Sequence, residues 1–303
     1  MAISKVRVKI NGVWTNLTLN NGKWTGTITA PSTTSYTQPD KYYPVTIEVT
    51  NDAGTVVTKD ATDATLGAAL RLVVKETMKP TIALVSPSNG AYVTNNKQAI
   101  VFKVTDEAAG SGVNLSTVKF KLDNTTYTAT SAGMAYTGIT NGYQFTFTPQ
   151  ATITDGKHSI TINASDNDGN AATAVTASFT VDTVPPTLTV SSPTTGSITN
   201  KSAATVSGKT NDATSSPVSV TITLNGASVG SVTVGSDGTF AKAITLAEGQ
   251  NTIVVTAKDG AGKTSSVTIK VKLDTTVPKL SSITLTPNPA NVSSSVAITV
   301  EVS

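Results

Sequence analysis

Apolar and polar residues alternate along most of this chain, and the clearest run spans residues 158–169, with the sequence His-Ser-Ile-Thr-Ile-Asn-Ala-Ser-Asp-Asn-Asp-Gly. Related runs occupy residues 43–54 and 251–262. In each copy the alternation ends in Asp or Asn, and a Gly follows three positions later. Alternation predicts a β-strand with one buried face, and the polar residue with its glycine predicts a turn into a second strand. The chain therefore contains three copies of a predicted β-hairpin.

Shorter alternating runs precede the first copy. The pairs Asn11-Gly12 and Asn21-Gly22 separate these runs, and Asn-Gly between alternating residues is a strong signal for a hairpin turn. The N-terminal segment is therefore predicted to be a β-meander. We expect residues 67–74 to form its last strand. The Leu-Gly-Ala-Ala-Leu sequence from residue 66 is also compatible with a short helix, but the glycine and the following valines favour a strand.

Proline-containing linkers divide the chain into domains. These linkers lie at residues 78–80, 182–186 and 274–278. We expect an N-terminal β-sandwich, two further sandwiches and the start of an incomplete fourth, at residues 1–77, 78–183, 184–276 and 277–303. About seven strands per domain, with frequent turns, predict an all-β fold of tandem sandwiches. The short linkers predict that the domains are arranged as a rod.

Composition excludes several classes of function. The chain has 303 residues, a net charge of +3 and no cysteine. No segment is strongly basic, so we expect no nucleic-acid partner. Without cysteine there is no disulfide and no thiolate metal ligand. No apolar run approaches the roughly 20 residues of a membrane span, and the start lacks the apolar centre of a signal peptide. We therefore expect no membrane insertion and no export address at the N-terminus.

The second and third domains share a pattern that resembles bacterial Ig-like repeats. Residues 153–158 (Ile-Thr-Asp-Gly-Lys-His) and 246–251 (Leu-Ala-Glu-Gly-Gln-Asn) carry its first half, and an Asp-Thr-x-x-Pro linker closes it. The resemblance covers about residues 77–276. It implies tandem Ig-like β-sandwiches that serve as spacers or adhesive arms, and it says little about what they bind.

A narrower resemblance concerns the whole chain. Residues 4–14 (Ser-Lys-Val-Arg-Val-Lys-Ile-Asn-Gly-Val-Trp), residues 67–76 and the tandem repeats are similar to Ig-like proteins encoded in prophage tail modules of Gram-positive bacteria. This resemblance implies a virion protein that is assembled in the bacterial cytoplasm in multiple, symmetrically arranged copies. It would be attached to a tail or baseplate and would contact host surface glycans. The alternatives are a bacterial cell-surface adhesin, a spacer of an exported protein and a capsid decoration protein.

Aromatic residues gather in the N-terminal domain, where exposed rings could stack on sugars or anchor a protein partner. The other interpretation is an ordinary core. Because Trp14 is only imperfectly in phase with Leu17, we expect one of these two residues to be exposed, and we expect Trp24 to lie in the core. We also expect residues 1–77 to be the docking domain.

Catalytic and nucleotide-binding patterns are weak. Residues 257–264 (Ala-Lys-Asp-Gly-Ala-Gly-Lys-Thr) satisfy a relaxed phosphate-loop pattern, but a strand-like run follows them, whereas a phosphate loop requires a helix. His158 is the only histidine, and Asn251 and Tyr43 occupy its position in the other copies. A structural position tolerates this exchange and a general base does not. We therefore expect no enzyme, no catalytic residue and no organic cofactor.

Calcium is the most specific ligand that the sequence indicates. Asp166, Asp168 and Asn170 place clustered oxygen atoms on one loop, and a hard cation prefers such ligands. The other interpretation is that Asp, Asn and Gly are present because the turn requires them. The third copy of the motif lacks the second carboxylate, which favours the turn interpretation. Further acidic residues lie at loops or linkers, where related adhesin repeats hold calcium between domains: Asp106, Glu107, Asp182 and Asp274.

Overall fold

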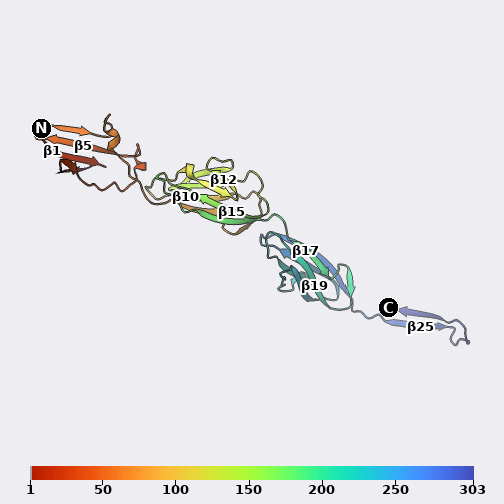
Figure 1. The fold of residues 1–303 in the computed structure, drawn as a ribbon. Coiled ribbons are helices and arrows are strands. Elements are labelled where there is room, and N and C mark those ends of the chain that lie inside the picture. Colours follow the sequence, from red (N-terminus) through yellow and green to blue (C-terminus); the bar gives the residue numbers. More distant parts are fainter. Residues whose placement is uncertain (1) are drawn as a thin grey trace. The chain divides into compact units, whose positions relative to one another are not determined.

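The computed structural model describes residues 2–303, and its contacts divide the chain into two compact units, the first ending at Thr183 and the second beginning at Val184. Figure 1 shows that strands make up nearly all of the regular structure in both units. Among the described residues, no helix has the length and apolar character needed to cross a bilayer. The predicted all-β fold is confirmed.

The N-terminal part of the first unit is built on an antiparallel sheet with the order β2-β1-β5-β6, and β7 also pairs with β5. A separate hairpin, β3–β4, lies outside this sheet. The strands span Ile3–Ile10 (β1), Val13–Asn16 (β2), Thr18–Asn20 (β3), Lys23–Thr25 (β4), Tyr43–Asn51 (β5), Val56–Lys59 (β6) and Arg71–Leu72 (β7). At the predicted turns, Asn11 and Gly12 have φ of 47° and 82°, the left-handed values that an Asn-Gly hairpin turn requires.

The expected last strand of this domain is only partly correct. Gly67–Leu70 forms a short 3₁₀ helix, η2, and only Arg71–Leu72 is extended. Two other short 3₁₀ helices, η1 (Ser35–Thr37) and η3 (Leu115–Thr117), lie in loops. The Gly67 amide donates to the Asp63 carbonyl, and a Cβ at Gly67 would lie 2.6 Å from the Ala61 carbonyl oxygen. Close packing on the preceding loop therefore turns the chain where its local sequence favours a strand.

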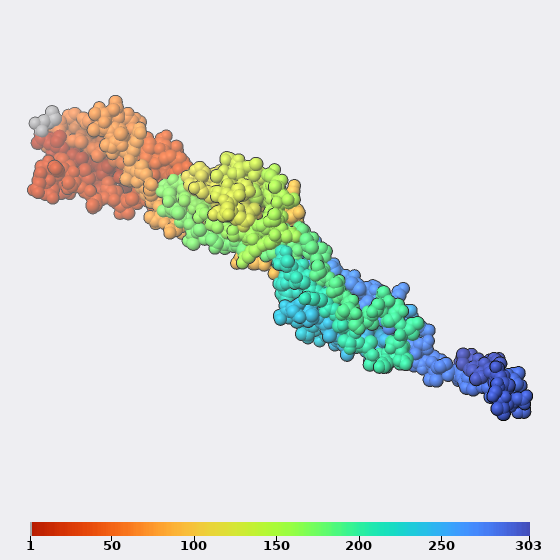
Figure 2. All heavy atoms as spheres, turned by 45° about the vertical axis from the view of Figure 1, so that its right-hand side comes forward, coloured from red at the N-terminus to blue at the C-terminus, as the bar shows by residue number. Residues whose placement is uncertain are grey.

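The second domain is a β-sandwich of a four-stranded sheet, β13-β14-β10-β8, and a five-stranded sheet, β12-β11-β15-β16-β9. Its strands span Thr81–Ser86 (β8), Ala91–Val93 (β9), Ile100–Thr105 (β10), Lys119–Leu122 (β11), Thr125–Thr128 (β12), Met134–Ile139 (β13), Gly142–Phe147 (β14), Gly156–Asn163 (β15) and Val175–Val181 (β16). Phenylalanines fill the space between the sheets, and the rings of Phe102 and Phe145 stack at 4.9 Å. Figure 2 shows this domain in yellow and green with its side chains drawn in full.

The third domain repeats the plan with a three-stranded sheet, β17-β19-β22, and a five-stranded sheet, β18-β24-β23-β20-β21. Its strands span Thr187–Ser192 (β17), Ser197–Thr199 (β18), Ala203–Asn211 (β19), Ser219–Leu224 (β20), Ala227–Ser228 (β21), Thr239–Thr245 (β22), Gly249–Lys258 (β23) and Thr264–Leu273 (β24). Aliphatic side chains and Phe240 make its core. A final hairpin, β25 (Leu280–Thr286) with β26 (Ala297–Val302), follows, and its apolar side chains are largely exposed.

In both sandwiches, a short early strand pairs in parallel with the last strand. β9 pairs with β16 in the second domain, and β18 pairs with β24 in the third. In the second domain Thr81 lies opposite Thr105, whereas Val181 lies opposite Gly156 at the start of β15. The chain therefore enters the domain at one end of the sandwich and leaves it at the other.

The three motif copies all become a strand followed by a turn, as predicted. After β5, the Asn51 Oδ1 accepts hydrogen bonds from the amides of Ala53 and Thr55. After β23, the Asp259 Oδ1 accepts from the Lys263 amide. The turn after β15 is longer and occupies residues 164–174. This longer loop brings additional polar groups to the end at which the chain enters the second domain.

Candidate metal centre at the junction of the first two domains

The structure gives the three residues predicted to bind calcium, Asp166, Asp168 and Asn170, different partners. Asp166 is 1% exposed, and its Oδ1 accepts from the amides of Gly169 (2.6 Å) and Asn170 (2.8 Å). The side-chain nitrogen of Asn170 donates to Asp166 Oδ2 at 2.8 Å. Asn170 thus presents a donor to this carboxylate, and it does not direct an oxygen toward the same point. The turn interpretation accounts for these bonds.

Asp168 joins the two domains. Its Oδ2 accepts from the Thr34 hydroxyl of the N-terminal domain and from the Glu76 amide (3.1 Å) in the connecting segment. Its carbonyl accepts from Lys75 Nζ at 3.2 Å. The Asn170 side chain adds a bond to the Glu76 carbonyl at 3.2 Å. Both residues therefore fasten the incoming chain to the loop after β15.

Asp166 instead belongs to a cluster of acidic residues from three segments. One carboxylate oxygen from each of Glu76, Asp106 and Asp166 lies within 4.8 Å of the others. Glu107 joins them, because the carboxyls of Glu76 and Asp106 lie close enough to raise its pKa. Sequence reasoning noted Asp106 and Glu107 as loop residues but missed Glu76. One signal in the sequence could have grouped two of these acids. Asp106 and Asp166 each follow a predicted strand, and the two strands end at the same end of the sandwich.

The surrounding loops position these carboxylates. Asp106 directly follows β10, and its Oδ2 accepts from the Gly112 amide at 2.7 Å. Glu76 is held through Oε1 by the amide (3.3 Å) and hydroxyl (3.0 Å) of Ser111. Gly110 leaves room for the acids, since a Cβ there would lie 2.8 Å from both Asp106 Oδ2 and Glu107 Oε1.

The cluster concentrates negative charge in a buried place. Burial is the largest cause that raises the pKa of Glu107 to about 7, and the neighbouring carboxyls of Glu76 and Asp106 raise it further. The ion pairs found among residues 2–303 all involve other carboxylates, so no lysine or arginine of the described chain neutralises the cluster by direct pairing. The arrangement is suited to a cation.

The third domain carries a related pair in the same places. Asp212 follows β19 and Asp259 follows β23, both are buried, and one carboxylate oxygen of each lies within 4.8 Å of the other. The Asp212 Oδ1 accepts from the amides of Thr214 and Ser215, as in a turn. Asp274, by contrast, is only half-buried and pairs with Lys272 at 3.0 Å.

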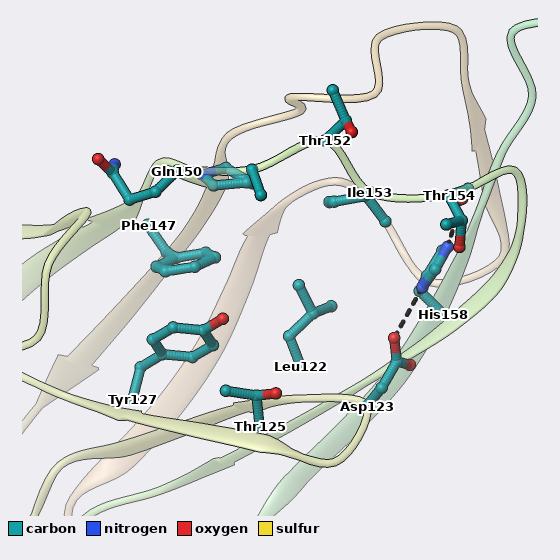
Figure 3. Close-up of a pocket in the computed structure, with 12 residues that line it drawn as sticks. Leu122, Asp123, Thr125, Tyr127, Phe147, Gln150, Thr152, Ile153, Thr154 and His158 are labelled. Carbon is teal, nitrogen blue, oxygen red and sulfur yellow. Dashed lines mark hydrogen bonds and ion pairs between the residues drawn. The ribbon is translucent and has the colours of Figure 1, made fainter.

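His158 lies at the other end of the second domain and has a structural role. Figure 3 shows its ring beside a cavity of about 390 Å³, directed at Asp123 and at the Thr154 carbonyl. Nδ1 lies 2.7 Å from Asp123 Oδ2, and Nε2 lies 2.7 Å from the Thr154 oxygen. Asn251 replaces the histidine in the third domain, where it bonds to Asn225 (3.1 Å) and to the Ala247 carbonyl (2.7 Å). Both ring nitrogens are engaged, so neither is placed to act as a base.

Other predicted features also have structural explanations. Residues 257–264 form the end of β23, a turn and the start of β24, which is not the strand-to-helix geometry of a phosphate loop. Trp14 is 36% exposed, with the Arg7 guanidinium 4.2 Å from its ring centroid. Trp24 is half-buried and lies outside the buried core that we expected for it.

Comparisons with known proteins agree with this architecture. Residues 80–162 match the family described as Bacterial Ig domain, and residues 186–275 match the family described as Glucodextranase, domain B. The second and third domains are Ig-like. No curated protein matches the chain.

Several solved structures are similar to the chain. Fibronectin(III)-like modules of CbhA from Clostridium thermocellum are 18% identical, with coverage of 64% of this chain and 94% of that one and a TM-score of 0.37. A tetra-tandem repeat from the extending region of a large adhesion protein is 21% identical, with coverage of 98% and 79% and a TM-score of 0.36. Sidekick-1 immunoglobulin domains 1–4 are 10% identical, with coverage of 90% and 68% and a TM-score of 0.39.

Proposed function

We propose that this chain is a non-enzymatic structural and adhesive arm in which Ig-like domains act as spacers in series. The observation that carries the proposal is the parallel pairing of β9 with β16 and of β18 with β24. Because each sandwich takes the chain in at one end and releases it at the other, every domain adds its length to the distance between its neighbours in the sequence.

The same pairing suits a chain under tension. Pulling on the two ends of a sandwich moves the paired parallel strands along each other, so their hydrogen bonds are stretched together and not one after another. The exit segments are also fastened. The Thr183 hydroxyl donates to both Asp155 carboxylate oxygens at 2.9 Å, and the Thr275 hydroxyl donates to Glu248 Oε2 at 2.8 Å. These bonds support a role in holding a fixed spacing.

For location, our proposal is a phage tail or baseplate, with the N-terminal domain as the docking part and with several copies in one symmetric assembly. The support is the similarity of residues 4–14 and 67–76 to prophage tail proteins. The exposed Trp14, flanked by Arg7 and by Lys9 at 5.3 Å, offers an aromatic and cationic surface for a protein partner. Host surface glycans are the proposed target of the arm.

The second candidate is a cell-surface adhesin or a spacer within an exported protein. The matches of residues 80–162 to a bacterial Ig family and of residues 186–275 to a domain of an enzyme favour it. The two locations place the same arm on different supports, and a fractionation experiment separates them.

The test is peptide mass spectrometry on two fractions of the source culture after DNA-damage induction. One fraction is the pelleted particles and the other is washed cell wall. Peptides of this chain that increase in the particle fraction on induction would support the virion location. Peptides confined to the wall would refute it and establish the second candidate. A Trp14→Ala variant should lower the particle-bound amount while the chain stays folded, and Leu19→Ala, at an exposed apolar residue of β3, is the matched control.

A further inference from the structure

We propose that Glu76, Asp106, Glu107 and Asp166 form a binding site for one calcium ion, and that the bound ion fastens the N-terminal domain to the second domain. The inference concerns a property of the chain itself and holds for either location of the arm. It differs from the sequence prediction in its ligands, because Asp168 and Asn170 are replaced by Glu76, Asp106 and Glu107.

Three carboxylate oxygens in the cluster are buried and have no hydrogen-bond donor: Glu76 Oε2, Asp106 Oδ1 and Glu107 Oε2. Asp106 as a whole is only 8% exposed. A buried oxygen without a hydrogen-bond donor is costly, and an ionised one is more so. A cation supplies the missing partner for all three oxygens at once.

The turn interpretation does not explain these atoms. It accounts for Asp166 Oδ1 and Asp106 Oδ2, because both accept backbone amides of their own loops. The oxygens without a donor are the second oxygen of Asp106 and one oxygen each of Glu76 and Glu107. No backbone amide of a turn donates to any of these three oxygens. Turn chemistry therefore orients Asp106 and Asp166, and it leaves one oxygen each of Glu76, Asp106 and Glu107 without a donor.

The donor set favours calcium over other metals. All four residues offer oxygen, the chain has no cysteine, and its single histidine lies beside Gly156 at the opposite end of the domain. Oxygen-only sites suit hard cations. Calcium takes about 6–8 oxygen ligands in flexible geometry, whereas magnesium demands a near-ideal octahedron. Carboxylates that come from three separate segments fit the more flexible ion.

The position of Glu76 gives the ion its mechanical effect. Glu76 lies in the segment that connects the two domains, and its amide and carbonyl bond to Asp168 and Asn170. Two residues earlier, the Val74 carbonyl accepts from the Ser35 amide at 2.8 Å. An ion held by Glu76 and by the loops after β10 and β15 therefore ties this connecting segment, and with it the N-terminal domain, to the second domain.

The test uses the full chain after treatment with a chelator, with calcium chloride or magnesium chloride as the probe. Amide hydrogen exchange is measured in peptides that cover residues 75–80, 106–112 and 164–170. We expect calcium to slow exchange in all three segments at least tenfold, and magnesium to require at least tenfold higher concentrations. Unchanged exchange, or an equal response to the two ions, would overturn the proposal.

Variants assign the ligands. Asp106→Asn and Glu107→Gln should each abolish the calcium-dependent protection and remove one bound calcium per chain in titration calorimetry. Asp155→Asn, beside Gly156 at the opposite end of the second domain, is the matched control, and it should bind calcium within threefold of the wild type. If Asp106→Asn disturbs folding, the result with Glu107→Gln alone decides whether the cluster binds calcium. Loss of binding in Asp155→Asn with retention in Glu107→Gln would refute the assigned ligands.

Discussion

Exchanging the His158 pair for its counterpart in the third domain tests whether the two Ig-like domains use one structural solution. His158 lies 2.7 Å from Asp123 Oδ2 and is 7% exposed. The Ser159 amide donates to Asp123 Oδ1 at 2.8 Å, and the Thr252 amide donates to Asn225 Oδ1 at the same distance. The two sites therefore share a backbone arrangement and differ in one pair of side chains.

The single and double exchanges should behave differently. In His158→Asn, an amide nitrogen can still donate to the Thr154 carbonyl, as Asn251 donates to Ala247, but the amide oxygen then faces the Asp123 carboxylate. Two opposed acceptors should cost about 1–2 kcal/mol, toward the lower end of the penalty for an unsatisfied buried group. Asp123 is 45% exposed in its side chain, so water relieves part of this cost. Adding Asp123→Asn supplies a donor and should restore most of the loss.

The assay is hydrogen exchange of β15 and β16 peptides in the full chain over a urea series, because a multidomain chain does not unfold in one step. For a domain of roughly 100 residues, each kcal/mol of lost stability lowers the melting temperature by about 4–8 °C. If Asp123→Asn fails to rescue His158→Asn, the proposed equivalence of the two sites is wrong.

The same pair predicts a dependence on pH. Burial opposes ionisation of Asp123, but the hydrogen bonds from His158 and Ser159 outweigh it and hold the pKa of Asp123 below its ordinary value of 3.8. A carboxyl with a lowered pKa in the folded state stabilises the fold above its unfolded pKa, and this contribution is lost as pH falls through the folded value. The wild type should therefore lose stability below about pH 4 at β15, and the double variant should lose less. Equal acid profiles would contradict this explanation.

Three further predictions concern packing and linkage. Phe145→Ala should lower the unfolding free energy of the second domain by about 3–5 kcal/mol, because it empties a fully buried position in the core. Tyr136→Ala, at an exposed ring, should lower it by under about 1 kcal/mol. Urea unfolding measures both changes. Gly208→Ala should separate β17 from β19, because the new Cβ would lie 2.1 Å from the Thr189 oxygen, and Gly138→Ala, with open space around it, should be near neutral by the same measurement. Calcium at 100 times its dissociation constant should raise the unfolding free energy of the second domain by about 2.7 kcal/mol. An unchanged urea midpoint would show that calcium does not bind preferentially to the folded state.

Local sequence signals predicted most of the fold. Asn11-Gly12 marks its turn because both residues tolerate left-handed backbone, and the alternation in residues 158–162 identifies a strand with one buried face. Local signals failed where tertiary packing decides the conformation. Gly67 lies against the Ala61 carbonyl, and this contact bends a segment whose own sequence favours a strand.

The candidate site was predictable only in part. Asp166 stands out in the sequence because it ends a strand and begins an oxygen-rich loop. The sequence alone does not show that Asp168 bonds to the N-terminal domain, because its partner, Thr34, lies 134 residues earlier in the chain. Glu76 carries no local signal, and its place in the cluster depends on how the connecting segment crosses the end of the second domain. The meeting of distant segments is a tertiary property that residue spacing does not encode.

The most direct test of the arm is single-molecule force spectroscopy on the full chain, held at its two ends. We expect separate unfolding steps for the second and third domains, each releasing about 30–35 nm as roughly 100 residues extend at up to about 3.6 Å per residue. We also expect a high force for each step, because parallel strands are sheared together. Smooth extension without separate steps, or one step that releases both domains together, would contradict the claim that Ig-like spacers are connected in series.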